Sequence, residues 1–204
     1  MEAEILLADK KNLADKIKEH IVDSTALNTL VNPIFGTLET CVYGMSDEIS
    51  INARLLGSGL IYAGMGSVIS KGRELYRKKF DITSKTSESL QAFHDAVYFG
   101  VFNGVFGPLF YFASGSRNIE EITYGTLGAI ATGIGSGWPT GYAIDVYKDL
   151  TGFTECNRKS YPKFIKNAHP KVKKMLAGAL AIGSIAIMAG IYSLTKDNID
   201  WNNF

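Results

Sequence analysis

The sequence predicts an all-α fold: a polytopic membrane helical bundle of five transmembrane helices, built as a duplicated two-helix hairpin plus a C-terminal helix. Three observations predict it. Five apolar segments alternate with charged blocks along the 204 residues, small residues recur at helical spacing, and two stretches resemble each other at a shift of about 71 positions. The mean hydropathy of +0.06 hides this pattern because the charges are segregated between the apolar segments.

Residues 1–22 are predicted to form an amphipathic helix at the cytoplasmic side. Leu13, Ile17 and Ile21 recur every four residues with lysines among them, which is the spacing of one apolar helix face. The helix can lie on the membrane with its lysines near anionic headgroups, or it can be a solvated lead-in, and the sequence leaves both open. The first residues lack the order of a signal peptide, so we expect the first span to act as the insertion signal.

The first predicted hairpin covers residues 23–80. Its first span, residues 24–46, holds one charge, Glu39, together with several polar residues that include Asn32. A carboxylate in mid-span costs at least about 2.5 kcal/mol, so it must face the bundle interior, be paired or be protonated. Its second span, residues 55–70, is free of charge but short. We expect flanking basic side chains to extend it by snorkelling.

The second predicted hairpin covers residues 90–150. Its first span, residues 96–116, is rich in aromatic residues and contains Asn103. Its second span runs from Ile122 to Ile144 without a charge, which is 23 residues and enough to cross the hydrocarbon core. Within that span three glycines recur every four residues and so line one face, which predicts close helix packing: Gly133, Gly137 and Gly141.

A basic cytoplasmic loop, residues 151–174, and a fifth span, residues 175–195, complete the predicted fold. The distribution of Lys and Arg sets the orientation, because 18 of the 21 lie in the N-terminal tail and in the connections after spans two and four. The positive-inside rule then places the protein in the cell membrane as a multi-pass protein, with its N-terminus in the cytoplasm and its C-terminus outside.

The internal repeat pairs spans one and two with spans three and four. The matched positions are Gly57, Gly64, Gly66, Glu74, Tyr76 and Arg77 with Gly128, Gly135, Gly137, Asp145, Tyr147 and Lys148, and Asp23 with Asp95. An even number of helices in each copy predicts parallel repeats, related by an axis along the membrane normal. Such duplication is typical of transporters with a site at the repeat interface, although channels and scaffolds also contain repeats.

Polar residues in apolar surroundings are the candidate substrate or proton-binding residues. Glu39 is the sharpest: it is either a proton carrier or ligand for a substrate ammonium, or a helix-end residue at the outer interface. Arg54 is on the same outer side, and a pair with Glu39 would satisfy both charges; such a pair can serve the site or be purely structural. Asp23 and Asp95 open outward-going helices, where a carboxylate can cap the free N–H groups or act in a site. Two asparagines can bond between helices or to a polar substrate: Asn32 and Asn103. Asp145, just after the fourth span, completes the candidate set.

Several functional classes find no support in the sequence. A nucleotide-binding loop, a catalytic triad and a metal-ligand spacing are all missing from it, so we expect neither an enzyme nor a metal or other cofactor. The net charge of +1 argues against a nucleic-acid partner. The predicted partners are membrane lipid, a small substrate and further copies of the chain, because four or five helices make a thin wall around a substrate path.

Part of the chain resembles the bacterial L-alanine exporter family over about residues 20–150. The first hairpin of that family is similar to Asp23-Ser24-Thr25, Glu39 and Gly44-Met45-Ser46-x-Glu48-x-Ser50-x-x-Ala53-Arg54-Leu55, and the end of its fourth helix to Gly141-Tyr142-x-x-Asp145. The resemblance implies a small inner-membrane exporter of L-alanine driven by the proton gradient. The N-terminal helix and the fifth span are additions to the four-span pattern of the family.

The sequence therefore leads to an amino-acid exporter for an L-alanine-like substrate, coupled to protons through Glu39, with Arg54 recognising the substrate carboxylate. The alternative from another class is a non-transporting membrane scaffold or assembly protein. Its support is the abundance of small-residue faces and the basic loop before the fifth span, which can dock a cytoplasmic partner.

Overall fold

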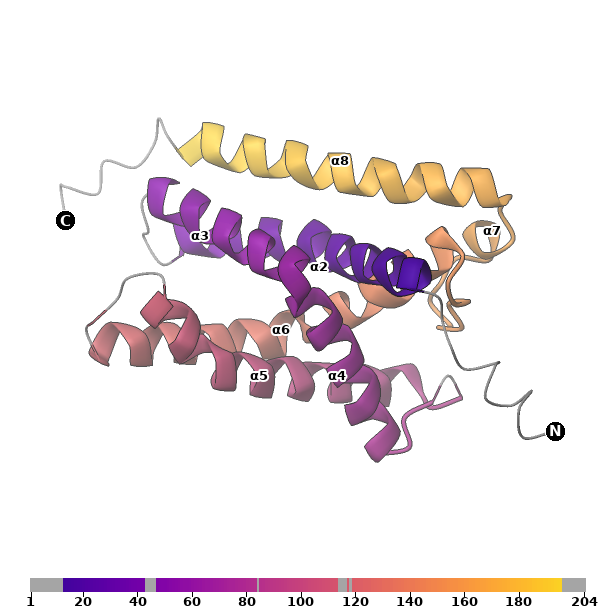
Figure 1. The fold of residues 1–204 in the computed structure, drawn as a ribbon, viewed down its shortest axis with the longest axis horizontal. Helices are drawn as coiled ribbons and strands as arrows, with labels where there is room; N and C mark the ends of the chain where they lie inside the picture. Colours follow the sequence, from indigo (N-terminus) through magenta and orange to yellow (C-terminus); the bar gives the residue numbers. More distant parts are fainter. Residues whose placement is uncertain (1–12, 43–46, 84, 114–116, 118, 196–204) are drawn as a thin grey trace.

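The computed structural model describes residues 13–42, 47–83, 85–113, 117 and 119–195, and over these residues the predicted all-α fold is confirmed (Figure 1). In chain order the helices are α2 (Leu13–Cys41), α3 (Asp47–Leu60), the π-helical turn η1 (Ile61–Met65), α4 (Gly66–Lys79), α5 (Glu88–Ala113), α6 (Ile119–Thr151), the short α7 (Lys163–Lys166) and α8 (Pro170–Thr195). The first twelve residues of the predicted lead-in helix lie outside the described ranges. Residues 13–22 continue into the first apolar segment as one helix, α2.

The long helices run along the length of the molecule (Figure 1). α2 packs against α8 on one side and against α6 on the other, and α5 and α6 form an antiparallel pair. The ends of α2, α5 and α8 gather with the starts of α3 and α6 at what we call the Glu39 end. The start of α2, the end of α4, the start of α5 and the end of α6 gather at the opposite end, which we call the Asp95 end.

The second apolar segment is broken rather than straight. α3 and α4 meet at η1, where Gly64 has a φ of +137°, far outside the helical range. Glycine adopts such a backbone conformation without the steric penalty of a Cβ. The break turns α4 across the molecule toward α5, so that the basic last turns of α4 lie at the Asp95 end (Figure 1).

The helices α4 and α6 end with the same cap. Asp81 after α4 has a φ of +53°, and Gly152 after α6 has a φ of +82°. The N–H of the following residue donates to the carbonyl oxygen of Arg77 at 2.9 Å in the first case and to that of Lys148 at 2.8 Å in the second. Both are Schellman motifs, which satisfy helix-end carbonyls. The corresponding residues of the two caps are 71 positions apart.

The glycine face of α6 packs directly on α5. A Cβ added at Gly137 would lie 2.6 Å from the Cα of Ala96, and one added at Gly133 would lie 2.7 Å from the carbonyl oxygen of Phe99. Gly141 lies against the carboxylate of Asp95 on the same face. The two backbones approach this closely only because the three positions carry no side chain.

Apolar side chains point outward on several of these helices. Among the described residues, α5 and α8 are long and apolar enough to cross a membrane. Their outward faces include large apolar side chains that are at least 60% exposed: Val101, Val105 and Leu109 on α5, and Ile182 and Ile185 on α8. The largest fully buried side chains are mostly polar: Arg73, Asp23, Asp95, Ser24, Ser50, Ser70, Thr40 and Thr140, with Leu27 and Ile144. In water-soluble domains the residues that are most often fully buried are apolar.

Candidate functional site

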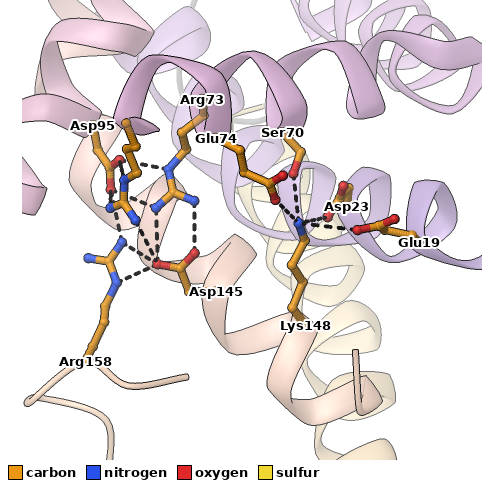
Figure 2. A network of polar contacts seen from close by, with 10 residues as sticks. Glu19, Asp23, Ser70, Arg73, Glu74, Asp95, Asp145, Lys148 and Arg158 are labelled. Carbon is orange, nitrogen blue, oxygen red and sulfur yellow. Dashed lines mark hydrogen bonds and ion pairs between the residues drawn. The ribbon is translucent and has the colours of Figure 1, made fainter. Parts of the chain in front are cut away.

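Three arginines surround two aspartates at the Asp95 end (Figure 2). Arg73 donates from Nε to Asp95 Oδ1 at 2.8 Å and from Nη1 to Asp145 Oδ1 at 2.9 Å. Arg77, one turn further along α4, donates from Nη2 to Asp95 Oδ2 at 2.7 Å. Arg158 donates from Nε to Asp145 Oδ2 at 2.8 Å and from Nη2 to Asp95 Oδ2 at 3.0 Å. We call these five residues the arginine cluster.

Local structure explains how the arginine cluster forms on the α5–α6 pair. Gly141 gives the buried ion pair its room, because a Cβ at this position would overlap the carboxylate of Asp95 and lie 2.9 Å from Arg73 Nη2. The carboxylate of Asp95 sits on the second turn of α5 and is fully buried. The desolvation cost of burying such a charge is offset only when the charge is paired and hydrogen-bonded. Asp95 accepts hydrogen bonds from three guanidinium groups.

Arg158 reaches the cluster from the loop that follows α6. Asp149, in the last turn of α6, holds that loop in place. The hydroxyl of Tyr161 donates to Asp149 Oδ2 at 2.7 Å, and the backbone N–H of Cys156 donates to Oδ1 at 3.3 Å. Lys173, at the start of α8, forms an ion pair with Asp149 Oδ2 at 2.7 Å. The loop therefore returns over the end of α6, and Arg158 is buried against the cluster.

A second cluster forms around one buried lysine (Figure 2). Lys148 Nζ lies 2.5 Å from Glu74 Oε1, 3.5 Å from Asp23 Oδ1 and 3.9 Å from Glu19 Oε1. It also donates to Ser70 Oγ at 3.3 Å. Its partners come from α2 and α4, so the lysine of α6 joins three helices. We call this group the lysine cluster.

The two clusters exchange partners between the two halves of the chain. Lys148 of α6 binds acids of α2 and α4, whereas Arg77 of α4 binds acids of α5 and α6. The corresponding positions are 71 or 72 residues apart: Arg77 with Lys148, Glu74 with Asp145, and Asp23 with Asp95. Each half thus supplies a base that pairs with acids of the other half. Arg73 and Arg158 have no counterparts in the lysine cluster.

The charges of the clusters shift the pKa values of their members. Burial opposes ionisation of Asp145, but Arg73 and the other two arginines outweigh it and hold the pKa of the carboxyl well below its usual range. Burial also disfavours the charged form of Lys148, yet the acids around it raise its pKa above the ordinary value. By formal charge, three guanidinium groups face two carboxylates, so the arginine cluster carries one positive charge in excess.

A polar cavity of about 180 Å³ lies beside both clusters. It is lined by basic, acidic and neutral polar side chains from α4, α5, α6 and the loops after α4 and after α6: Arg77, Lys148, Arg158, Glu74, Asp145, Glu155, Gln91, Thr83, Thr154 and Asn157, with Ile82 and Cys156. Pockets for drug-sized ligands begin at about 300 Å³, so this cavity suits a smaller molecule. Its walls present both signs of charge, which is the chemistry that binds a zwitterion.

The Glu39 end holds a separate buried ion pair. Arg54 Nη2 lies 2.5 Å from Glu39 Oε1, and the hydroxyl of Ser50 donates to Glu39 Oε2 at 2.7 Å. The Ser50 hydroxyl also bonds with the hydroxyl of Tyr192 on α8 at 2.9 Å. Arg54 Nε is buried and has no hydrogen-bond partner, while its guanidinium lies 5.0 Å from the centre of the Phe35 ring. The predicted pairing of Glu39 with Arg54 is present.

The remaining predicted site residues lie in different surroundings. Asp23 and Asp95 sit inside α2 and α5 and not at their first residues, so the capping role predicted for them is wrong. Asn32 donates to Ser58 Oγ at 2.9 Å, between α2 and α3. Asn103 donates to the carbonyl oxygen of Ala129 at 3.0 Å, between α5 and α6, and lines an apolar cavity of about 430 Å³. Both asparagines bond helix to helix.

Sequence reasoning missed the site roles of Arg73, Arg158, Lys148 and Glu74 because it treated the basic residues only as orientation signals. One signal was available. Glu74 and Arg77 have the same acid-x-x-base spacing as Asp145 and Lys148, which places each acid and base on one helix face. Within the part of the chain that the structure describes, no group of three or more His, Cys, Asp or Glu side chains could hold a metal ion.

Comparison with known proteins found no protein-family model, no curated protein and no solved structure that matches this chain. The resemblance to L-alanine exporters therefore stays a prediction that depends on the quoted motifs. Of those motifs, residues 44–46 lie outside the described ranges.

Proposed function

We propose that the chain is a multi-pass membrane protein with five spans, its N-terminus in the cytoplasm and its C-terminus outside. The outward apolar faces of α5 and α8 support this arrangement, as does the polar interior. The two ends of the molecule support it too. The last turns of α4 and the segment that follows α6 are rich in Lys and Arg, and both lie at the Asp95 end (Figure 1). The positive-inside rule makes this the cytoplasmic end.

The bundle consists of two copies of one hairpin, with α8 added. The shared Schellman caps of α4 and α6 support the duplication, because their residues are 71 positions apart. The exchanged ion pairs support it further, because a parallel duplication related by a two-fold axis places the base of each hairpin on the acids of the other. The interface of the two hairpins is the place where such transporters bind their substrate.

The function is the export of a small amino acid of the L-alanine type, driven by the proton gradient. One observation carries this proposal: a small cavity of mixed charge lies where the two hairpins exchange their ion pairs. A zwitterion needs both a cation and an anion in its site, and this cavity offers both. The resemblance to the exporter family supplies alanine as the substrate, and Glu39, paired with Arg54 at the opposite end, is the proton carrier.

Efflux from cells tests the function directly. Cells that carry the chain and cells that lack it are loaded with an alanyl dipeptide, and the released alanine is followed over time. We expect faster release from cells with the chain and a collapse of the difference when the proton gradient is dissipated. A panel of other amino acids in the same assay defines the substrate. Identical release from both kinds of cell would remove the exporter proposal.

The second candidate function is a membrane scaffold, and one observation favours it. The basic segment between α6 and α8 presents Phe164 to solvent with 78% of its surface exposed, among lysines on α7 and at the start of α8. An exposed aromatic ring in a basic surrounding suits an acidic partner protein. If the chain is a non-transporting scaffold, Phe164→Ser should abolish binding of the partner protein, and amino-acid efflux should be the same with and without the chain.

We further propose that the chain forms a homo-oligomer. Three glycines of α8 have no atom within 4 Å of an added Cβ, which leaves this helix open to a neighbouring copy: Gly178, Gly183 and Gly190. Small residues on an exposed membrane helix favour close helix association. Mass measurement in lipid nanodiscs distinguishes a monomer from a larger assembly.

A further inference from the structure

Lysines and large apolar side chains share the outward face of α4. They recur at intervals of three and four residues, which places them on one side of the helix: Val68, Lys71, Leu75, Lys78 and Lys79. All five are exposed, Val68 by 53% and Leu75 by 67%. The opposite side of α4 is buried and carries Arg73 of the arginine cluster. We call the five exposed residues the α4 outer face. A face turned to water is polar, so the valine and the leucine favour an apolar partner.

The lysines of the α4 outer face are not neutralised by the protein. Among the ion pairs of the described residues, none involves these three side chains. Glu74 is the acid of α4, and its carboxylate contacts Lys148 of α6 instead. Asp81 follows the end of the helix and is exposed, so one nearby acid stands against three lysines. The surface is therefore positively charged and attracts anions.

Aromatic rings border these lysines where α4 meets α5. The ring centre of Tyr76 lies 4.8 Å from that of Phe80 and 5.7 Å from that of Tyr98. The ring of His94 lies 5.2 Å from Phe80 and 5.7 Å from Phe93, which is 61% exposed. Aromatic side chains gather where a membrane meets water, and tyrosine is enriched there. The border therefore has the composition of the headgroup region.

The two kinds of side chain are ordered along α4. The apolar Val68 is nearest the break at Gly64, and Lys78 and Lys79 are nearest the end of the helix. That end lies at the Asp95 end of the molecule, which the proposed orientation places in the cytoplasm (Figure 1). A helix that leaves the acyl layer and ends among the headgroups has this order, because lysine stems lie along apolar surface while their charged ends reach water.

We propose that the α4 outer face is a binding surface for anionic phospholipid of the cytoplasmic leaflet. Its lysines contact the headgroup phosphates, and Val68 and Leu75 lie among the acyl chains. Cytoplasmic leaflets carry anionic lipid, which attracts basic segments beside a membrane span. The proposal rests on the membrane arrangement proposed above and not on the transported substrate. An acidic protein is the alternative partner for the lysines, and the experiment decides between the two.

Native mass spectrometry of the full chain in detergent measures the preference. The chain is titrated with phosphatidylglycerol or with phosphatidylcholine of the same acyl chains, so that only the headgroup differs. We expect the Kd of the first bound lipid to be at least about fivefold lower for phosphatidylglycerol, the factor for one lysine near an anionic surface. More ammonium acetate should narrow the difference, because salt screens exposed charges. Equal Kd values for the two lipids would overturn the proposal and leave the lysines to an acidic protein.

Variants locate the preference on α4. The test variant replaces the lysines of the α4 outer face: Lys71→Gln, Lys78→Gln and Lys79→Gln. The matched control removes the same charge from exposed lysines of α7 and the start of α8: Lys163→Gln, Lys171→Gln and Lys174→Gln. We expect the test variant to bind both lipids about equally and the control to keep the preference of the wild type. A control that loses as much preference as the test variant would assign it to the overall charge of the cytoplasmic side.

If the test variant does not fold, as judged by circular dichroism, the double variant Lys78→Gln, Lys79→Gln leaves the interior of α4 unchanged and should still lower the preference. Alkaline carbonate extraction of vesicles that contain the wild-type chain keeps this proposal distinct from the membrane arrangement. Release of the chain from the vesicles would overturn both. A chain that stays in the vesicles but shows no preference for phosphatidylglycerol in the titration would overturn the lipid surface alone. The expected result is a retained chain with that preference.

Discussion

Gly137 of α6 lies on the backbone of Ala96 in α5, so closely that a Cβ at position 137 would be 2.6 Å from the Ala96 Cα. Gly66 and Ser24 form the corresponding contact 71 and 72 positions earlier, where a Cβ at position 66 would be 3.1 Å from the Ser24 Cα. In both halves of the chain the second helix therefore meets the first through a glycine. Lipid provides little hydrophobic force between helices, so contacts of this kind hold the pairs together.

We expect Gly137→Ala to lower the free energy of unfolding by about 1–3 kcal/mol, because the added methyl group must push α5 and α6 apart. Gly135→Ala is the matched control on the same helix, since no atom lies within 4 Å of a Cβ at that position. This variant should be neutral or more stable by up to about 1 kcal/mol, because Ala favours the helix over Gly. Chemical unfolding of the detergent-solubilised chain, followed by circular dichroism, measures both. Equal stabilities of the two variants would contradict the tight α5–α6 contact.

Replacing Lys148, the lysine of the lysine cluster, should lower the free energy of unfolding. Lys148→Met leaves the Asp23 carboxylate, which is 1% exposed, without its cation, and breaking a buried ion pair costs about 3–5 kcal/mol. Adding Asp23→Asn to that variant removes the stranded charge and should restore a large part of the loss. Lys159→Met, at an exposed position of the following loop, should change stability little. The same unfolding assay applies, and no recovery in the double variant would show that Asp23 does not depend on Lys148.

The glycine face of α6 and the Glu39–Arg54 pair could be predicted because each follows from a local rule. Three glycines at intervals of four must share one helix face, and a charged side chain in an apolar segment needs a partner nearby. The structure places both features where these rules put them: the glycines against α5, and Glu39 against Arg54.

The arginine cluster could not be predicted because it depends on two changes of chain direction. Gly64 turns α4 toward α5, and without that break Arg73 would not reach Asp95. The cap at Gly152 and the bonds of Asp149 then return the loop that carries Arg158. Helix periodicity carries no information on such turns. The capping role predicted for Asp95 was wrong for a different reason: α5 begins seven residues earlier, at Glu88.

The arginine cluster should make the fold sensitive to acid. The pKa of Asp145 is lowered in the folded chain: burial works against this, and the three arginines outweigh it. A carboxyl with a lowered folded pKa stabilises the fold above its unfolded pKa, and this stability is lost as the pH falls through the folded pKa. We expect the free energy of unfolding to fall by up to about 1.4 kcal/mol per pH unit below about pH 4 through this group alone.

Asp145→Asn removes that contribution. The variant should be less stable than the wild type at pH 7, and its stability should fall less steeply between pH 4 and pH 3. Unfolding measured at pH 3, 4, 5 and 7 gives both slopes. Asp81→Asn is the control, because Asp81 is exposed and Asn tolerates its positive φ. A slope that is the same in Asp145→Asn and the wild type would mean that another group causes the acid sensitivity.

Proton coupling through Glu39 predicts a variant that folds but transports slowly. Gln at position 39 still accepts the hydrogen bond from Ser50 but cannot release a proton, so we expect Glu39→Gln to slow proton-driven alanine efflux by about 100-fold. Arg54 would then be a charge without its partner, which destabilises the fold. The double variant Glu39→Gln, Arg54→Gln removes this unpaired charge. Flux is measured in proteoliposomes under an imposed pH gradient. Because the double variant has a neutral pair and no titratable carboxyl, a response to the gradient as strong as in the wild type would assign the proton to another residue.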